Sequence, residues 1–170
     1  MKYNHSTIRA LGLASLIALV MTSNSVAVNA QTPSPVRTPK APCRLDLEDP
    51  HISGSLLKSK GKPYMKANVS SICDFPQSQT SISIFLYKKG LFADHIVAQQ
   101  NFRMKKSEPP TLRVDVFDTV ALCVSKELTQ YYTESFSKAF IKGKWMYAGR
   151  TKSNLTPPIA CGTKSLNPFT

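Results

Sequence analysis

The sequence lacks the short motifs that identify many enzymes and metalloproteins. Its seven glycines are scattered, so it has no glycine-rich loop to cradle a phosphate. It has no Gly-x-Ser-x-Gly turn, which presents the nucleophilic serine of many hydrolases. Its four cysteines are far apart, and no two form the Cys-x-x-Cys pair of a zinc or redox site. We therefore expect no metal and no cofactor, and these absences favour a protein that is not an enzyme.

No apolar run is long enough to cross a membrane. The stretch from Ala10 to Met21 is too short, because a spanning helix needs about 20 apolar residues. Lys2 and Arg9 make the preceding segment positive, and Val28-Asn29-Ala30 places small residues where a signal peptidase cleaves. We predict a cleaved signal peptide over residues 1–30, a mature protein that begins at Gln31 and has no transmembrane segment, and a secreted, extracellular location.

Prolines are concentrated directly after the predicted cleavage site. Residues 31–42 contain Pro33, Pro35, Pro39 and Pro42, a composition typical of an extended linker. The remaining chain is long enough for one domain with a hydrophobic core. We predict a folded domain over residues 43–161 and a C-terminal tail over residues 162–170.

The four cysteines all lie in the predicted domain, at Cys43, Cys73, Cys123 and Cys161. An even number of cysteines in a small secreted domain indicates disulfides, and four cysteines allow three pairings. We predict Cys43–Cys73 and Cys123–Cys161, because a cysteine that opens one strand can meet a cysteine that closes its antiparallel neighbour. The main alternative is Cys43–Cys161 with Cys73–Cys123.

The hydrophobic pattern of this region has a period of two, as in half-buried strands. The segment from Ser81 to Tyr87 alternates at its start, with Ile82, Ile84 and Leu86 inward and Ser81 and Ser83 outward, and a similar alternation runs from Tyr64 to Cys73. Weaker strands are expected near residues 44–48, 51–57, 96–102, 145–150 and 159–161, with a break at Asp74-Phe75-Pro76. About seven or eight strands predict an all-β fold, an antiparallel Ig-like β-sandwich with two disulfides.

Residues 126–141 are ambiguous between helix and strand. Leu128, Tyr132, Phe136 and Phe140 recur every four residues, which fits one face of a helix. The density of Tyr, Thr and Phe favours a strand instead, and so does the strand pattern of the rest of the chain. We favour the strand.

The chain is strongly basic, with a formal charge of +12, and it keeps +10 when Lys2 and Arg9 leave with the signal peptide. Such a charge favours polyanionic partners. Two basic clusters in expected turns are candidate binding surfaces: Lys58, Lys60 and Lys62, and Arg103, Lys105 and Lys106. We expect the partner to be an anionic polymer of the cell envelope or a protein, and we expect no specific nucleic acid.

Aromatic residues cluster late in the chain, interleaved with lysines. Tyr132 and Trp145 are the candidates from this segment, because rings beside cations can stack on sugars or bases. Two other functions stay open. One is a secreted hydrolase that uses His51 or His95 with an acidic partner. The other is an inhibitor or toxin that acts through an exposed loop at residues 88–94.

Several short segments, taken in order, resemble a group of known proteins. They are Ile52-Ser53-Gly54-Ser55, Ser71-Ile72-Cys73, Ile84-Phe85-Leu86-Tyr87, Cys123-Val124, Tyr131-Tyr132-Thr133, Gly143-Lys144-Trp145, Pro157-Pro158 and Ile159-Ala160-Cys161. The order is similar to that in small secreted β-proteins of actinobacteria, which are mostly uncharacterised. The resemblance implies an all-β fold and secretion, and it carries no known site. It departs at residues 124–128, where such proteins tend to have a Gly-Tyr turn.

Overall fold

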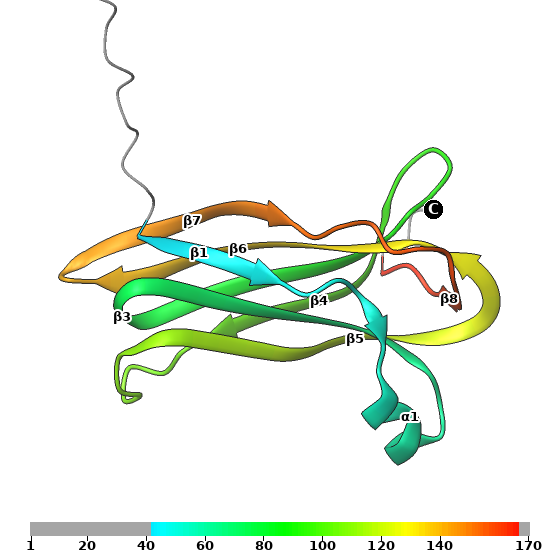
Figure 1. Ribbon diagram of the computed structural model, residues 1–170, viewed down its shortest axis with the longest axis horizontal. Coiled ribbons are helices and arrows are strands. Elements are labelled where there is room, and N and C mark those ends of the chain that lie inside the picture. The colour runs from blue at the N-terminus through cyan, green and yellow to red at the C-terminus, as the bar shows by residue number, and fades with distance from the viewer. Residues whose placement is uncertain (1–41, 167–170) are drawn as a thin grey trace, which may run out of the picture. The chain divides into compact units, whose positions relative to one another are not determined.

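The computed structural model describes residues 42–166, and Figure 1 shows a predominantly antiparallel β-structure with one short helix. The elements are β1 (Cys43–Leu47), β2 (His51–Ile52), α1 (Gly54–Lys60), β3 (Tyr64–Lys88), β4 (His95–Arg103), β5 (Thr111–Thr129), β6 (Tyr131–Ile141), β7 (Lys144–Lys152) and β8 (Ile159–Thr163). No helix among these residues is long and apolar enough to span a membrane.

Strand β3 organises the fold because its two halves pair with different neighbours. The first half pairs with β1, β2 and β5, and the second half pairs with β4 and β6. The chain does not leave the strand at Asp74-Phe75-Pro76, where we expected a break. Instead the register shifts between Ile72 and Gln77, and β3 doubles back on itself (Figure 1).

A buried glutamine stabilises this bend of β3. The side chain of Gln77 is fully buried, and its amide nitrogen donates to the backbone carbonyls of Ser71 (2.9 Å) and Leu112 (3.2 Å). Its amide oxygen accepts hydrogen bonds from the hydroxyls of Ser71 and Thr80, each at 3.0 Å. Each polar atom of the Gln77 amide therefore has partners, as a buried polar group requires. Two residues later, Gln79 has a φ of 50°, so the backbone turns through a conformation uncommon for non-glycine residues.

Both halves of β3 contribute to one hydrophobic core. Val69 from the first half and Ile82 and Ile84 from the second half belong to the same buried cluster, together with Leu45 of β1 and Ala148 of β7. The alternation expected from Tyr64 to Cys73 is present in part: Met65, Ala67, Val69, Ser71 and Cys73 on one face are all buried, but Asn68 and Ser70 on the other face are buried too.

The predicted disulfides, Cys43–Cys73 and Cys123–Cys161, are both present. Cys43 and Cys73 are direct cross-strand partners of β1 and β3, with their Cα atoms 4.1 Å apart. The expected placement at strand ends holds for Cys43 only, because Cys73 lies within β3 and Cys123 lies within β5. Lateral pairing, rather than a shared strand end, brings the sulfur atoms together.

The strand expected at residues 51–57 is wrong beyond Ile52, because Gly54–Lys60 forms α1. The side chain of Ser53 accepts a hydrogen bond from the backbone N–H of Leu56 and caps the helix N-terminus. Gly61 has a φ of 64° and closes its C-terminus, as glycine often does.

The strand favoured for residues 126–141 is confirmed, and the helical alternative is wrong. The segment is divided at Gln130, between the end of β5 and the start of β6. Along β6, Thr133, Ser135 and Ser137 are buried, while Phe136 between them is exposed. A spacing of four is also a multiple of two, so Tyr132, Phe136 and Phe140 share one face of a strand as well as they would share one face of a helix.

Candidate functional site

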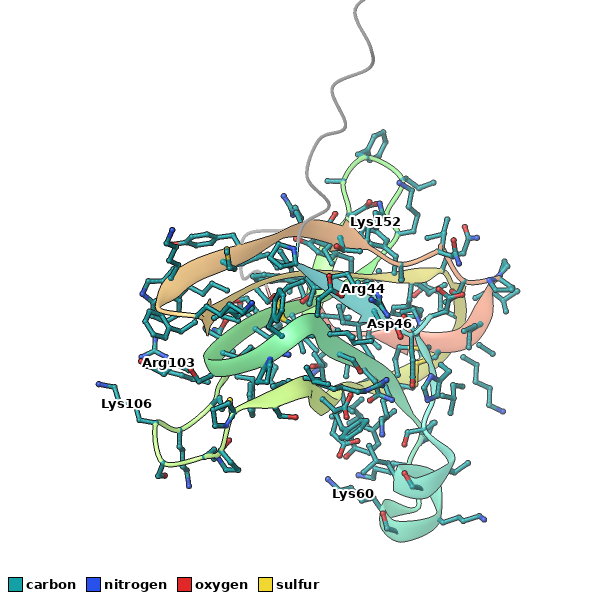
Figure 2. The ribbon with its side chains drawn as sticks, turned by 60° about the vertical axis from the view of Figure 1, so that its left-hand side comes forward. Arg44, Asp46, Lys60, Arg103, Lys106 and Lys152 are labelled. Atoms are coloured by element: carbon teal, nitrogen blue, oxygen red, sulfur yellow. A yellow bond between two sulfur atoms is a disulfide. The ribbon has the colours of Figure 1, made fainter. Side chains whose placement is uncertain are left out.

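Three separate segments bring cations to one end of the molecule. They are the end of β4 with the loop that follows it, the second half of β6, and the turn that joins β6 to β7. Their cationic residues, which we call the basic end, are Arg103, Lys105, Lys106, Lys138, Lys142 and Lys144. Figure 2 shows Arg103 and Lys106 at this end, whereas Lys60 lies well away from them.

The turn between β6 and β7 is set by its two central residues. Lys142 and Gly143 both have positive φ, 48° and 79°, as in a type I′ hairpin turn. This turn directly joins the paired residues Ile141 and Lys144. The local sequence therefore fixes where Lys142 and Lys144 are displayed.

The basic end surrounds a hollow of about 250 Å³. The residues that line it are Gln79, Ser81, Arg103, Met104, Lys106, Lys138 and Trp145. The positive side chains of Arg103, Lys106 and Lys138 thus share one concave surface with the indole of Trp145. An anion bound beside this hollow is close to several cations, and a ring can stack on Trp145.

Trp145 is held in place by neighbouring rings and cations. Phe140 contacts it edge-on, with ring centroids 5.5 Å apart, and Lys138 Nζ lies 5.2 Å from its ring centroid. Its side chain is still 44% exposed. Nearby, Lys142 Nζ lies 3.3 Å from the ring centroid of Phe75. These cation–π contacts orient the lysines while their ammonium groups remain at the surface.

A second hollow, also about 250 Å³, adjoins the first. Its lining consists of Ser81, Ser83, Phe136, Ser137, Lys138 and Tyr147. Ser81 and Lys138 line both hollows, so the two are contiguous. Sequence reasoning selected Trp145 here but gave no role to Gln79, Ser81 or Ser83. Their outward position in the alternating pattern is the only signal that marked the two serines.

The cations of the basic end are not neutralised by carboxylates. Within residues 42–166, the ion pairs are Lys66–Asp118 (2.7 Å), Lys89–Asp94 (3.2 Å), Arg113–Asp115 (2.7 Å) and Arg150–Glu134, and none includes a cation of the basic end. The acidic residues on the β3 bend and the β4–β5 loop are Asp74 and Glu108, both exposed. The local balance of charge is therefore strongly positive.

The cluster of Lys58, Lys60 and Lys62 is not part of the basic end. Lys58 and Lys60 lie in the last turn of α1, where positive charge interacts favourably with the helix dipole. Lys60 Nζ also lies 5.3 Å from the ring centroid of Tyr64. The two basic clusters therefore form separate surfaces (Figure 2).

Tyr132 differs from Trp145 both in its burial and in its contacts. It is 4% exposed, and its ring stacks on Tyr87 with centroids 4.9 Å apart. Its hydroxyl donates to Asp94 Oδ2 at 2.9 Å, and Lys152 Nζ covers the ring at 3.5 Å. Burial and the neighbouring Asp94 carboxylate raise the pKa of Tyr132 above its ordinary value. These contacts tie β6 to the base of the β3–β4 loop and leave little of the ring for a ligand.

The β3–β4 loop displays two apolar side chains in solvent. Leu91 is 98% exposed and Phe92 is 101% exposed. The base of the loop is fixed by Asp94, which accepts hydrogen bonds from the Tyr132 hydroxyl and the Gly90 N–H. Burial alone would raise the pKa of Asp94, but these hydrogen bonds and Lys89 outweigh it, so the pKa is lowered.

The two histidines lie apart from the basic end. His51 is exposed, and its Nδ1 lies 3.3 Å from the backbone carbonyl of Asp49. His95 lines a hollow of about 650 Å³ together with Glu127 and Leu128. Across residues 42–166, neither imidazole is hydrogen-bonded to a carboxylate, and no group of three or more His, Cys, Asp or Glu side chains is placed to hold a metal ion.

Comparison with known proteins assigns no relatives to this chain. No model of a protein family matches it, and no match is found among curated proteins or among solved structures. The resemblance to secreted actinobacterial β-proteins therefore stays a prediction.

Proposed function

We propose that this protein is a secreted, non-enzymatic binding module that associates with anionic polymers of the cell envelope through its basic end. The observation that carries the proposal is the convergence of Arg103, Lys106 and Lys138 on one hollow, without a carboxylate partner. We also propose that the signal peptide over residues 1–30 directs export, and that the strands form an Ig-like sandwich. The two disulfides suit an oxidising compartment.

Electrostatic attraction explains how such a module would bind without a deep pocket. Exposed cations attract a polyanion over a distance of about 8 Å at physiological ionic strength, and added salt screens this attraction. The cations of the basic end lie on two loops and the three strands next to them, at the surface, so they can reach a flexible polymer without full desolvation. Binding should therefore weaken steeply as the salt concentration rises.

The test compares two variants with the same change in net charge. One replaces Arg103, Lys105 and Lys106 with Gln, and the other replaces Lys58, Lys60 and Lys62 with Gln. Binding to intact cell envelopes and to polyphosphate is measured at low and high salt. We expect the first variant to lose most of its binding and the second to retain it.

Equal losses in the two variants would mean that net charge alone attracts the polymer and that the basic end has no special part. If neither added salt nor the first set of substitutions changes the binding, an electrostatic mechanism is rejected. Failure to bind either probe at low salt would reject the proposed function.

A second candidate function is inhibition or toxicity through the β3–β4 loop. It is favoured by Leu91 and Phe92, because fully exposed neighbouring apolar side chains often mark interaction sites. The purified protein would be mixed with secreted proteases and with neighbouring bacteria, and compared with a variant carrying Leu91→Ser and Phe92→Ser. An effect that disappears in the variant would support this candidate, and no effect in any assay would eliminate it.

A further inference from the structure

We infer that the two contiguous hollows form one groove that binds an acidic glycan, a polymer whose sugar rings stack on aromatic side chains and whose carboxylate, sulfate or phosphate groups meet the basic end. This inference rests on the proposed function and names the class of polymer. The evidence for it is the arrangement of the outward-facing side chains of β3, β4, β6 and β7.

Strand register places the relevant side chains next to one another on one surface. Ser81 is opposite Lys138 of β6 and Arg103 of β4. Lys138 is in turn opposite Tyr147 of β7. One step along β3, Ser83 is opposite Phe136 of β6 and Asn101 of β4. Because side chains alternate between the faces of a strand, these residues share the face opposite the core.

Small side chains on β3 open the groove between larger ones. Ser81 and Ser83 lie between the long side chains of β4 on one side and those of β6 on the other. The hollows occur at these two serines, and Ser81 lies in both. A larger side chain at either position would fill the space that a sugar residue needs.

The walls of the groove suit sugar rings. The exposed fractions of Phe136, Trp145 and Tyr147 are 47%, 44% and 68%. Flat exposed rings can pack against the C–H faces of a pyranose, as aromatic side chains pack against other apolar surfaces. Neutral hydrogen-bonding groups at Gln79, Ser81 and Ser83 lie beside these rings, on β3, and can bind hydroxyl groups.

The charge along the groove favours a glycan over a single-stranded nucleic acid. A nucleic acid carries one phosphate per nucleotide, so its binding proteins combine stacking rings with a positive groove that follows the whole backbone. Here the cations gather at the first hollow. Beyond Phe136 the same face carries Glu134, which is paired with Arg150 and lies opposite Lys152, so one carboxylate and two cations occur there. The positive charge of the groove is thus greatest at the first hollow, and the second hollow, whose lining has Lys138 as its one cation, is mainly aromatic and hydroxyl-bearing.

The experiment separates ring recognition from charge attraction. Wild-type protein is titrated with a panel of acidic glycans (polygalacturonate, alginate and hyaluronate), with polyphosphate, which has no rings, and with a single-stranded DNA oligonucleotide. The variants are Trp145→Ala and Tyr147→Ala. The matched control is Phe117→Ala, which removes an aromatic ring of similar exposure, 56%, from β5.

We expect at least one acidic glycan to bind more tightly than polyphosphate, with part of this binding surviving high salt. Trp145→Ala and Tyr147→Ala should each weaken that binding about tenfold, the effect of losing one stacking contact. Their binding of polyphosphate and the behaviour of Phe117→Ala should be unchanged. Thermal unfolding of each variant would establish that the fold is retained.

Other outcomes separate the two proposals. If polyphosphate binds as tightly as every glycan and the aromatic variants change nothing, the glycan inference fails while the proposed function stands. If the DNA binds more tightly than every glycan, and if its binding depends on Trp145, the groove is a nucleic-acid site and the inference is overturned. If no anionic polymer binds at low salt, the proposed function fails and the inference fails with it.

Discussion

The groove and the β3–β4 loop both expose apolar side chains, but they hold them in different ways. In the groove, Phe136 is 47% exposed and stacks on Phe85 with ring centroids 6.0 Å apart. At the tip of the loop, Phe92 is 101% exposed, and its position depends on contacts at the base of the loop rather than on the ring itself. Figure 1 shows the loop and the β6–β7 turn at opposite ends of the strands.

This difference shows where local stability and surface function are coupled. Side chains of the groove stand on paired strands, so removing one affects both the surface and the packing around it. The tip of the loop can change without any loss of burial, whereas its base cannot. Each prediction below perturbs one of these regions and uses the other as its reference.

The largest effect is expected at the bend of β3, which supports the groove. Gln77→Ala should lower the free energy of unfolding by about 3–5 kcal/mol, because it deletes a buried amide and leaves its partners on Ser71, Thr80 and Leu112 unsatisfied. Chemical denaturation would measure the loss, and hydrogen exchange should increase at the bend more than in the β3–β4 loop. The exposed Gln99 of β4 supplies the control, since Gln99→Ala should change stability by less than about 0.5 kcal/mol. Similar values for the two variants would contradict this account of the bend.

Local patterns in the sequence were sufficient to predict most of the strands. The alternation from Tyr64 to Cys73 predicted the strand and its apolar buried face, although Asn68 and Ser70 on the other face are buried as well. The helix at Gly54–Lys60 was missed because its seven residues are too few to establish a helical period, although Ser53 and Gly61 are suitable caps. The continuity of β3 through Pro76 was also missed, because the buried amide of Gln77 that stabilises the bend acts through tertiary contacts.

The candidate site could be predicted only in part. Arg103, Lys105 and Lys106 are adjacent in sequence, so their clustering needed no knowledge of the fold. Their association with Trp145 depends on the placement of β4, β3, β6 and β7 side by side, which no local pattern encodes. The same topology keeps them apart from Lys60, which belongs to the other of the two basic clusters indicated by the sequence (Figure 2).

An intermediate effect is expected at the base of the loop. Tyr132→Phe removes the hydroxyl that donates to Asp94, and it should cost about 1–2 kcal/mol, because hydrogen bonds to charged groups are stronger than neutral ones. Asp94 has a lowered pKa in the folded protein. Its carboxylate therefore stabilises the fold above the unfolded pKa of about 3.9, and this contribution is lost as the pH falls through the folded pKa.

The variant should weaken that acid-dependent contribution. The pKa of Asp94, followed by NMR of its carboxyl carbon, should rise toward its ordinary value in Tyr132→Phe. Asp115 is a suitable internal control, because Ser70 and Arg113 lower its pKa independently of Tyr132. An unchanged pKa of Asp94 would mean that the tyrosine hydroxyl does not stabilise the carboxylate.

The smallest effect is expected at the tip of the loop, and it tests the comparison directly with one residue type. Phe92→Ser should change the free energy of unfolding by less than about 0.5 kcal/mol, because a fully exposed ring loses no buried area. Phe136→Ser, at the groove, should cost about 1 kcal/mol or more, since half of that ring is buried and it stacks on Phe85. Both values come from the same chemical denaturation assay. Equal losses would show that Phe92 packs against the protein in solution, and the loop would then be part of the folded core rather than a surface that projects from it.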